Sequence, residues 1–199
     1  MILRVDPRNP DPSSIARAAE ALRRGELVVM PTETVYGLAA DPRVPGAEAK
    51  IFAAKGRPED KAIARLASHV DQIQSAGADI SGAALKLAKR FWPGPLTLVL
   101  RTGNEWTGYR IPAHEVALEL LRNMRTVLAV TSANRSGEPP AIDASEAARS
   151  LGSSVALVLD AGSSAGTVPS TVVRVDGSGA EILREGAIPR KIIEDVLGK

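Results

Sequence analysis

Cysteine is absent from the sequence, histidine occurs only twice, and aromatic residues make up 3% of the chain. The absence of cysteine excludes disulfides, thiolate nucleophiles and cysteine-ligated zinc, and it fits a cytoplasmic protein. Two histidines are too few for a histidine-rich metal site. The scarcity of aromatic side chains argues against a surface on which successive nucleic-acid bases stack.

Long apolar segments and a strong charge excess are missing as well. No run of about 18 apolar residues, the length that a membrane-spanning helix needs, occurs in the sequence. The opening residues MILRVDPRNP lack the apolar core of a secretory signal. The formal net charge is only +2, so any site for an anion must come from a local cluster of cations. We therefore expect a protein without membrane association.

The remaining composition is that of a globular domain, since 44% of the residues are hydrophobic and 24% are charged. Short apolar runs, often β-branched, predict strands at residues 26–30, 96–100, 126–130, 155–160 and 170–175. Another strand at 181–184 follows across the turn DGSG. We predict a single three-layer α/β domain over residues 1–199, with a twisted, mixed parallel and antiparallel sheet flanked by helices.

Helices are predicted between these strands. Asp11 and Pro12 are typical of a helix start, and the apolar face that follows them ends at Gly25. A second apolar stripe, over residues 80–91, is stopped by WPGP because proline cannot continue a helix. The last predicted helix opens at Pro189. We expect its buried residues to be Ile192, Ile193 and Val196.

The stretch AAKGRPEDK (residues 53–61) combines three cations with a glycine and a proline. On a helix over residues 47–55, Lys55 leans toward the buried face. The glycine is suited to end that helix, so Arg57 and Lys61 fall on the loop. The stretch is either a site for phosphates or a solvated turn in which Glu59 and Asp60 reduce the repulsion between the cations.

Polar residues also gather in loops that follow strands, which is where ligands bind in open α/β sheets. In PTETVYGLAAD, the hydroxyls of Thr32 and Thr34 can contact a ligand or form an ordinary turn. In TSANRSGEPP, Ser132 and Asn134 with exposed backbone N–H groups suit contact with an oxyanion. The alternative there is a polar turn entering a helix at 143–151.

Further candidates lie near the C-terminus and beside a proline turn. A Gly/Ser-rich loop over residues 160–169 leads to Ser170, and its glycines would permit closure over a ligand. Arg110 in YRIPAH and Arg184 in ILREG are each either a surface residue or a ligand for an anion.

Common catalytic motifs are absent from the sequence. It contains no Walker loop, no G-x-G-x-x-G fingerprint and no G-x-S-x-G elbow. His69 follows an apolar run and His114 begins a predicted helix, and neither is paired with a serine nucleophile. We expect both histidines to have structural or surface roles.

Seven of these stretches occur in an order that resembles the threonylcarbamoyl-AMP synthases, the YrdC-like family. They are PTETVYGL, KGRPEDK, WPGPLT, RIP, TSANRSGEPP, PSTVV and ILREG, and the resemblance spans residues 26 to about 186. It implies the short, single-domain, YrdC-like form. It also implies a reaction in which L-threonine, bicarbonate and ATP give threonylcarbamoyl-AMP and pyrophosphate, for the threonylcarbamoyl-adenosine of tRNA.

The resemblance implies roles for particular residues. Three cations would hold the ATP phosphates: Lys55, Arg57 and Lys61. The rest of the nucleotide site would be Ser132, Asn134 and Arg184. Threonine or its carbamate would be held by Thr32, Thr34, Arg110, Ser170 and the backbone near Val130.

No covalent catalysis is implied, and Lys55 and Arg57 would act electrostatically. Mg²⁺ would be carried on the ATP phosphates, without a metal site in the protein and without an organic cofactor.

The chain departs from the family pattern at several positions. Leu66 stands where many members have a histidine, and Lys61 stands where many have asparagine. The segment EWTGY before Arg110 replaces an apolar run and leaves open which residue touches the nucleotide, with Thr107 as the candidate.

The sequence leaves two alternatives to the synthase open. One is a module that binds double-stranded RNA or tRNA without catalysis. The other is a carbamoyl-handling domain related to hydrogenase maturation enzymes. For a synthase, the expected partners are tRNA or double-stranded RNA and the proteins that transfer the threonylcarbamoyl group onward in the cytoplasm.

Overall fold

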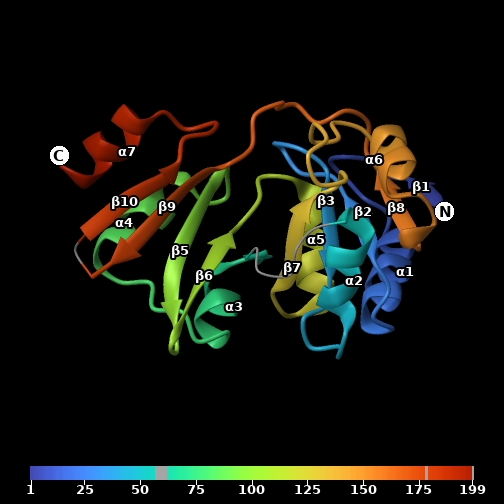
Figure 1. Ribbon diagram of the computed structural model, residues 1–199, viewed down its shortest axis with the longest axis horizontal. Helices are drawn as coiled ribbons and strands as arrows, with labels where there is room; N and C mark the ends of the chain where they lie inside the picture. The colour runs from blue at the N-terminus through green and yellow to red at the C-terminus, as the bar shows by residue number, and fades with distance from the viewer. Residues whose placement is uncertain (57–61, 178, 199) are drawn as a thin grey trace.

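The computed structural model describes residues 1–56, 62–177 and 179–198. Ten strands form one sheet in the order β1-β8-β2-β3-β7-β4-β6-β5-β9-β10 (Figure 1). The strands are β1 (Ile2–Arg4), β2 (Val28–Met30), β3 (Gly37–Ala40), β4 (Ala64–Leu66), β5 (Leu96–Thr102), β6 (Glu105–Arg110), β7 (Leu128–Ser132), β8 (Leu157–Asp160), β9 (Thr171–Asp176) and β10 (Gly179–Arg184). The sheet contains parallel pairs such as β5/β9 and antiparallel pairs such as β5/β6, which confirms the predicted mixed sheet.

The helices are α1 (Pro12–Arg23), α2 (Ala47–Lys55), α3 (Val70–Ser75), α4 (Gly82–Phe91), α5 (Glu115–Met124), α6 (Ala144–Leu151) and α7 (Arg190–Leu197), and a short 3-10 turn follows α6. Asp11 caps α1 by accepting from Ser14 N at 2.9 Å, as its position predicts. No helix in the described part of the chain is long and apolar enough to cross a membrane.

The prediction for α7 is wrong for Ile192 and is met only in part by Val196, which is half-buried against the core. Ile193 is fully buried, but its neighbour Ile192 is 41% exposed. Adjacent residues on a helix point about 100° apart, so a narrow contact with the sheet cannot bury both.

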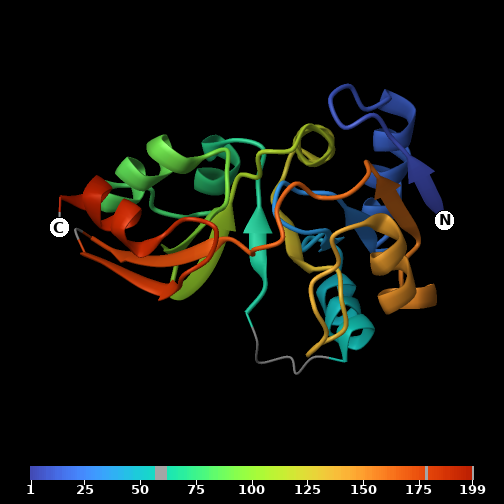
Figure 2. The ribbon, with the colours of Figure 1, turned by 90° about the horizontal axis from the view of Figure 1, so that it is seen from above.

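Helices cover the two halves of the sheet differently. Over β1, β8, β2, β3 and β7, α1 and α5 cover one face, with Leu22 and Leu120 in the core between. α2 and α6 cover the opposite face of that half, where Leu38 and Ile51 are buried. Over the other half, α3, α4 and α7 lie on the same side as α1 and α5, above a core that includes Leu98 (Figure 2).

The second face of β5, β6, β9 and β10 has no helix over it among the described residues (Figure 2). Along β5, Leu96, Leu98 and Leu100 are buried under the helices, whereas Thr97 and Val99 alternate to the other side. The third layer of the predicted domain therefore covers only half of the sheet. The other half leaves a face on which a ligand can lie.

The chain entering β9 and the chain leaving β10 cross closely at the edge of this open face. A Cβ atom on Gly186 would lie 2.3 Å from Pro169 O and 2.6 Å from Ser170 O, so only glycine fits there. The Thr171 hydroxyl accepts from Gly186 N at 3.0 Å and locks the crossing. This contact fixes the backbone at Ser170.

Candidate active site

A cavity of about 710 Å³ lies against the open face of the sheet, a size typical of small-molecule sites. The loop over residues 131–140 and the turn over residues 32–37 form much of its remaining wall. The structure brings together most of the residues that the sequence predicts for a ligand. Those lining the cavity are Thr32, Thr34, Arg110, Val130, Ser132, Asn134, Ser170 and Arg184.

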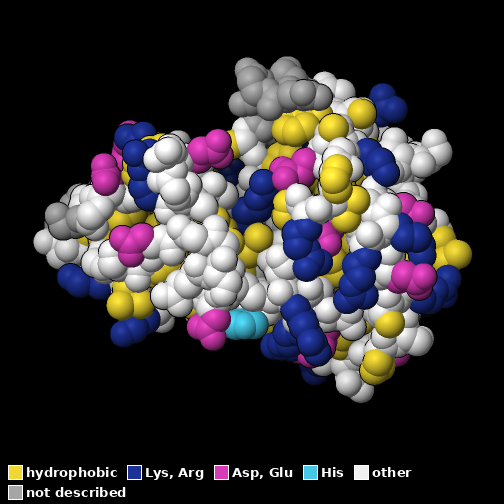
Figure 3. Space-filling view, turned by 90° about the horizontal axis from the view of Figure 1, so that it is seen from below, with side chains coloured by type: hydrophobic (Ala, Val, Ile, Leu, Met, Phe, Trp, Pro, Cys, Tyr) yellow, Lys and Arg dark blue, Asp and Glu magenta, His cyan; other side chains and the backbone are white. Residues whose placement is uncertain are grey.

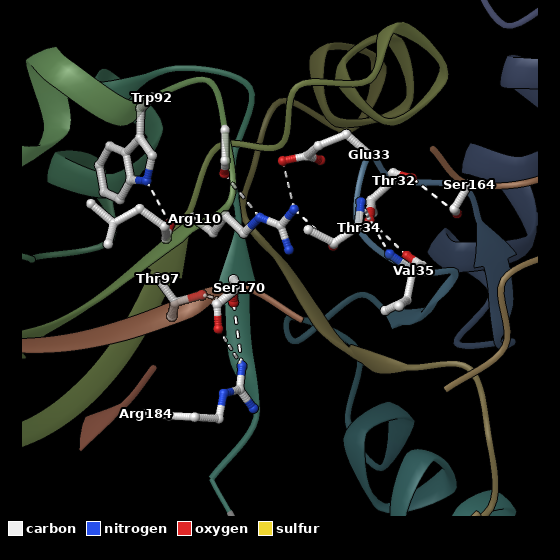
Figure 4. A network of polar contacts seen from close by, with 12 residues as sticks. Thr32, Glu33, Thr34, Val35, Trp92, Thr97, Arg110, Ser164, Ser170 and Arg184 are labelled. Carbon is white, nitrogen blue, oxygen red and sulfur yellow. Dashed lines mark hydrogen bonds and ion pairs between the residues drawn. The ribbon is translucent and has the colours of Figure 1, made fainter. Parts of the chain in front are cut away.

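Arg110 is buried at the end of β6. Its Nε donates to Gly94 O at 3.1 Å, and its Nη2 donates to Thr34 Oγ1 at 3.0 Å. Nη2 also lies 2.7 Å from Glu33 Oε1. Figure 4 shows the third nitrogen, Nη1, pointing away from these partners and toward the side of Ser170. Because these partners take Nε and Nη2, an anion in the cavity would meet this guanidinium at Nη1.

Thr32 and Thr34 have different roles. The Thr32 hydroxyl donates to Val35 O at 2.6 Å and accepts from Thr34 N at 3.2 Å, which is the ordinary turn described above as the alternative. Since the Thr32 hydrogen is used, the Thr34 hydroxyl donates to Thr32 Oγ1, at 3.0 Å, and accepts from Arg110. Thr32 therefore orients Thr34.

Ser170 lies next to a second arginine of the cavity, Arg184. Its Oγ lies 2.8 Å from Thr97 Oγ1, and Arg184 Nη2 donates to Ser170 O at 2.8 Å (Figure 4). Burial, and then the charge of Arg110, lowers the pKa of Arg184 below that of an ordinary arginine. Arginine remains charged despite such a shift. Two guanidinium groups near each other in one cavity attract anions strongly.

The Gly/Ser-rich loop over residues 160–169 is fastened to the turn of the two threonines. Gly166 N donates to Glu33 O at 3.0 Å, and a Cβ atom on Gly166 would lie 2.7 Å from that oxygen. The Tyr36 hydroxyl donates to Gly162 O at 2.5 Å, and burial raises the pKa of Tyr36 to about 12. Gly166 thus serves close approach of two backbones.

Lys55 is 4% exposed at the end of α2, which confirms that it leans inward. Its Nζ donates to Ser132 O and to Asn134 O, both at 2.5 Å. Lys55 therefore ties α2 to the loop over residues 131–140 and lies behind the residues that line the cavity. Its predicted contact with phosphates stays a prediction. The predicted partners Arg57 and Lys61 lie outside the described residues.

The backbone N–H groups of residues 133–136 are used within the protein. They donate, in order, to Tyr36 O, Ser132 O, Ser150 Oγ and Lys55 O. The expected set of exposed N–H groups for an oxyanion is therefore not present at these four residues. The Asn134 amide donates to Arg135 O and Glu138 O, both at 2.8 Å, and so holds the loop in shape.

Alternation along β6 decides which of its side chains reach the cavity. Trp106, Gly108 and Arg110 line it. Thr107 pairs with Leu100, whose side chain is buried on the helix-covered face, so the expectation that Thr107 touches a ligand is wrong. Counting back by twos from Arg110 would have identified Trp106.

Trp106 provides an aromatic wall at the outer part of the cavity. The guanidinium carbons of Arg101 and Arg174 lie 5.2 Å and 5.7 Å from its ring centroid, within the range of cation–π contacts. Val172 and Leu183 are also among the residues that line the cavity. An apolar and aromatic surface with cations at its edge suits a flat heterocycle.

Neither histidine forms a nucleophilic pair in the cavity. Ser68 Oγ lies 2.7 Å from His69 Nδ1, but Ser68 is buried and neither residue lines the cavity. Burial lowers the pKa of His114, and its Nδ1 is buried without a hydrogen-bond partner among the described residues.

Among the residues that the structure describes, no group of three or more His, Asp and Glu side chains is placed to hold a metal ion. Leu66 lines the cavity as an apolar side chain.

Comparison with known proteins identifies similar chains. A family model named Sua5_yciO_yrdC and described as telomere recombination matches residues 20–186. A Mycobacterium tuberculosis protein, provisionally named threonylcarbamoyl-AMP synthase, is 39% identical over 194 residues and covers 92% of this chain and 89% of its own length. The threonylcarbamoyl-AMP synthase of Bacillus subtilis is 36% identical, with 97% of this chain and 59% of its own covered.

A solved structure is similar over the whole chain. It is Pyrococcus abyssi Sua5 complexed with L-threonine, with a TM-score of 0.92 and 36% identity. The match covers 100% of this chain and 61% of the Pyrococcus chain. This chain thus spans about three fifths of the two longer relatives and most of the Mycobacterium protein.

Replacing Lys55 with methionine should loosen the loop over residues 131–140. The change leaves the carbonyls of Ser132 and Asn134 without their ammonium donor, at a cost of at least about 2 kcal/mol. Amide hydrogen exchange should become faster in this loop. Lys50→Met is the matched control, because Lys50 on the same helix donates to Gly25 O instead. Unchanged protection of the loop in Lys55→Met would contradict the proposed tie.

Proposed function

The chain belongs to the Sua5/YciO/YrdC family, and we propose that its cavity is the active site of a threonylcarbamoyl-AMP synthase. The enzyme is a nucleotidyltransferase that joins L-threonine, bicarbonate and ATP into threonylcarbamoyl-AMP and pyrophosphate. Its product serves the threonylcarbamoyl-adenosine modification of tRNA. Residues 1–199 act as one catalytic unit, in the cytoplasm, where ATP, tRNA and the downstream transfer proteins meet.

One observation carries the proposal. Arg110 and Arg184 both line one cavity and are close enough to affect each other's charge, and this cavity holds no paired serine or cysteine nucleophile among the described residues. Two cations in one site suit two anions, here the threonine carboxylate and the α-phosphate of ATP. The Nη1 edge of Arg110 receives the carboxylate. Ser170 and the backbone at Val130 flank the carbamate, and Arg184 faces the nucleotide.

The reaction needs no covalent intermediate with the protein. The threonine amine attacks the carbon of bicarbonate, and water leaves to give a carbamate. A carbamate oxygen then attacks the α-phosphate, and pyrophosphate leaves with the bond electrons. Catalysis of this kind rests on placing the reactants and stabilising charge, which the arginines and hydroxyls of the cavity supply.

The phosphates lie toward α2 and the loop over residues 131–140 in this proposal. Ser132 offers a hydroxyl there, and Asn134 and Lys55 shape the loop that carries it. Lys55, Arg57 and Lys61 supply positive charge to the triphosphate. Mg²⁺ arrives with ATP as part of the substrate, and no organic cofactor takes part.

The adenine base lies on the outer part of the open face. The Trp106 ring, flanked by two arginines, provides the aromatic surface that a purine needs, and Val172 and Leu183 add apolar area to the cavity lining. This places the base and the threonine at opposite ends of one cavity, with the α-phosphate between them.

Binding of double-stranded RNA or tRNA without catalysis is the weaker candidate. On the face shown in Figure 3, Lys and Arg side chains are interspersed with Asp and Glu and form no unbroken basic surface. The net charge of +2 likewise argues against a broad basic surface for RNA. RNA binding with a steep dependence on salt, in a protein that makes no adenylate, would favour this candidate.

Pyrophosphate release from ATP tests the proposed activity. Purified protein should release pyrophosphate only when L-threonine and bicarbonate are both present, and serine should replace threonine poorly. Release that needs no threonine, or no release at all, would refute the synthase.

Replacing Trp106 with alanine should weaken ATP use. Loss of a stacking surface costs about 1–3 kcal/mol, so KM for ATP should rise about tenfold to a hundredfold while KM for threonine stays nearly constant. Trp106→Phe keeps an aromatic face and serves as the matched variant, with most of the affinity retained. Equal KM values for ATP in wild type and Trp106→Ala would place the base elsewhere.

A further inference from the structure

The carboxylate of Glu33 lies against the guanidinium of Arg110, behind the cavity lining. Its Oε1 lies 2.7 Å from Arg110 Nη2, and the two side chains are only 18% and 8% exposed. Both carboxylate oxygens are buried, and neither makes a well-aligned hydrogen bond among the described residues. A buried charge is costly unless an opposite charge compensates it. The carboxylate is thus held there by its charge contact with Arg110.

The contacts of Arg110 leave one edge for a ligand. Nε is directed to Gly94, and Nη2 is shared by Thr34 and Glu33. In Figure 4 the Glu33 carboxylate lies on the side of the guanidinium opposite to Ser170, while Nη1 points toward Ser170. Glu33 itself is not among the residues that line the cavity. A ligand can therefore meet Arg110 without meeting Glu33.

We propose that Glu33 is a positioning residue that acts on threonine through Arg110. Its charge compensates the buried guanidinium and offsets the repulsion between Arg110 and Arg184. Its place on Nη2 fixes the rotation of the guanidinium, so that Nη1 is aimed at the substrate carboxylate. This inference rests on the proposed function, in which Arg110 receives threonine.

Competition between Glu33 and the substrate for Arg110 would have the opposite effect on threonine binding. Glu33 would act as a competitor if its carboxylate occupied the edge that the substrate needs, and removing it would then tighten threonine binding. The geometry favours positioning, because Glu33 and the cavity lie on different edges of the guanidinium.

Glu33→Gln separates these effects, because it removes the charge and keeps the shape. KM for threonine should rise about tenfold to a hundredfold, with KM for ATP unchanged within about twofold. Glu33→Asp keeps the charge and should recover part of the threonine affinity. Glu48→Gln is the matched control: Glu48 forms a partly buried ion pair with Arg65 outside the cavity, and both KM values should stay as in wild type.

Each outcome decides the inference. A lower KM for threonine in Glu33→Gln, or KM values for both substrates that stay constant or rise together, would overturn it. A melting temperature that falls equally in Glu33→Gln and Glu48→Gln, without a selective change in KM for threonine, would show a structural role only. A wild-type protein without threonine-dependent pyrophosphate release would refute the proposed function instead, and calorimetric titration with threonine would then show whether Glu33 still affects binding.

Discussion

An uncovered half of one sheet face is the constraint on which the proposed site depends. α2 and α6 cover β2, β3 and β8 on that side but do not reach β5, β6 and β9. Side chains that alternate out of the core there meet a cavity instead of a helix. Because the loop over residues 131–140 stands beside this face, residues distant in sequence reach one volume. A ligand completes the layer that the fold leaves open.

The cavity holds two positively charged side chains, Arg110 and Arg184, and neighbouring groups of the protein hold both in place. Arg110 and Arg184 are each bonded to backbone carbonyls, and Glu33 offsets part of their charge. The turn that carries Thr34 is in turn fastened to the loop at Gly166. Because the protein itself holds these side chains by hydrogen bonds and an ion pair, substrate binding needs little further ordering of them. That is what a reaction driven by placement of two anions requires.

The sequence predicts the parts of this site that follow from local periodicity. From helical geometry the sequence predicts that Lys55 points inward, and from its resemblance to the family it predicts roles for Arg110 and Arg184. It could not show that Lys55 meets two carbonyls, because that contact depends on how α2 packs against a distant loop. Glu33 was missed because a charged residue between two threonines looks solvated until the fold buries it. Thr107 was expected to touch the nucleotide, whereas the alternation of side chains along β6 directs Trp106 to the cavity instead.

The most direct test of the central claim is the identity of the product. Purified protein would be incubated with ATP, L-threonine and isotope-labelled bicarbonate. The adenylates would then be separated and identified by mass spectrometry. We expect threonylcarbamoyl-AMP that carries the labelled carbon between the threonine nitrogen and the phosphate. An unlabelled threonyl adenylate, or no adenylate beyond the products of ATP hydrolysis, would contradict it.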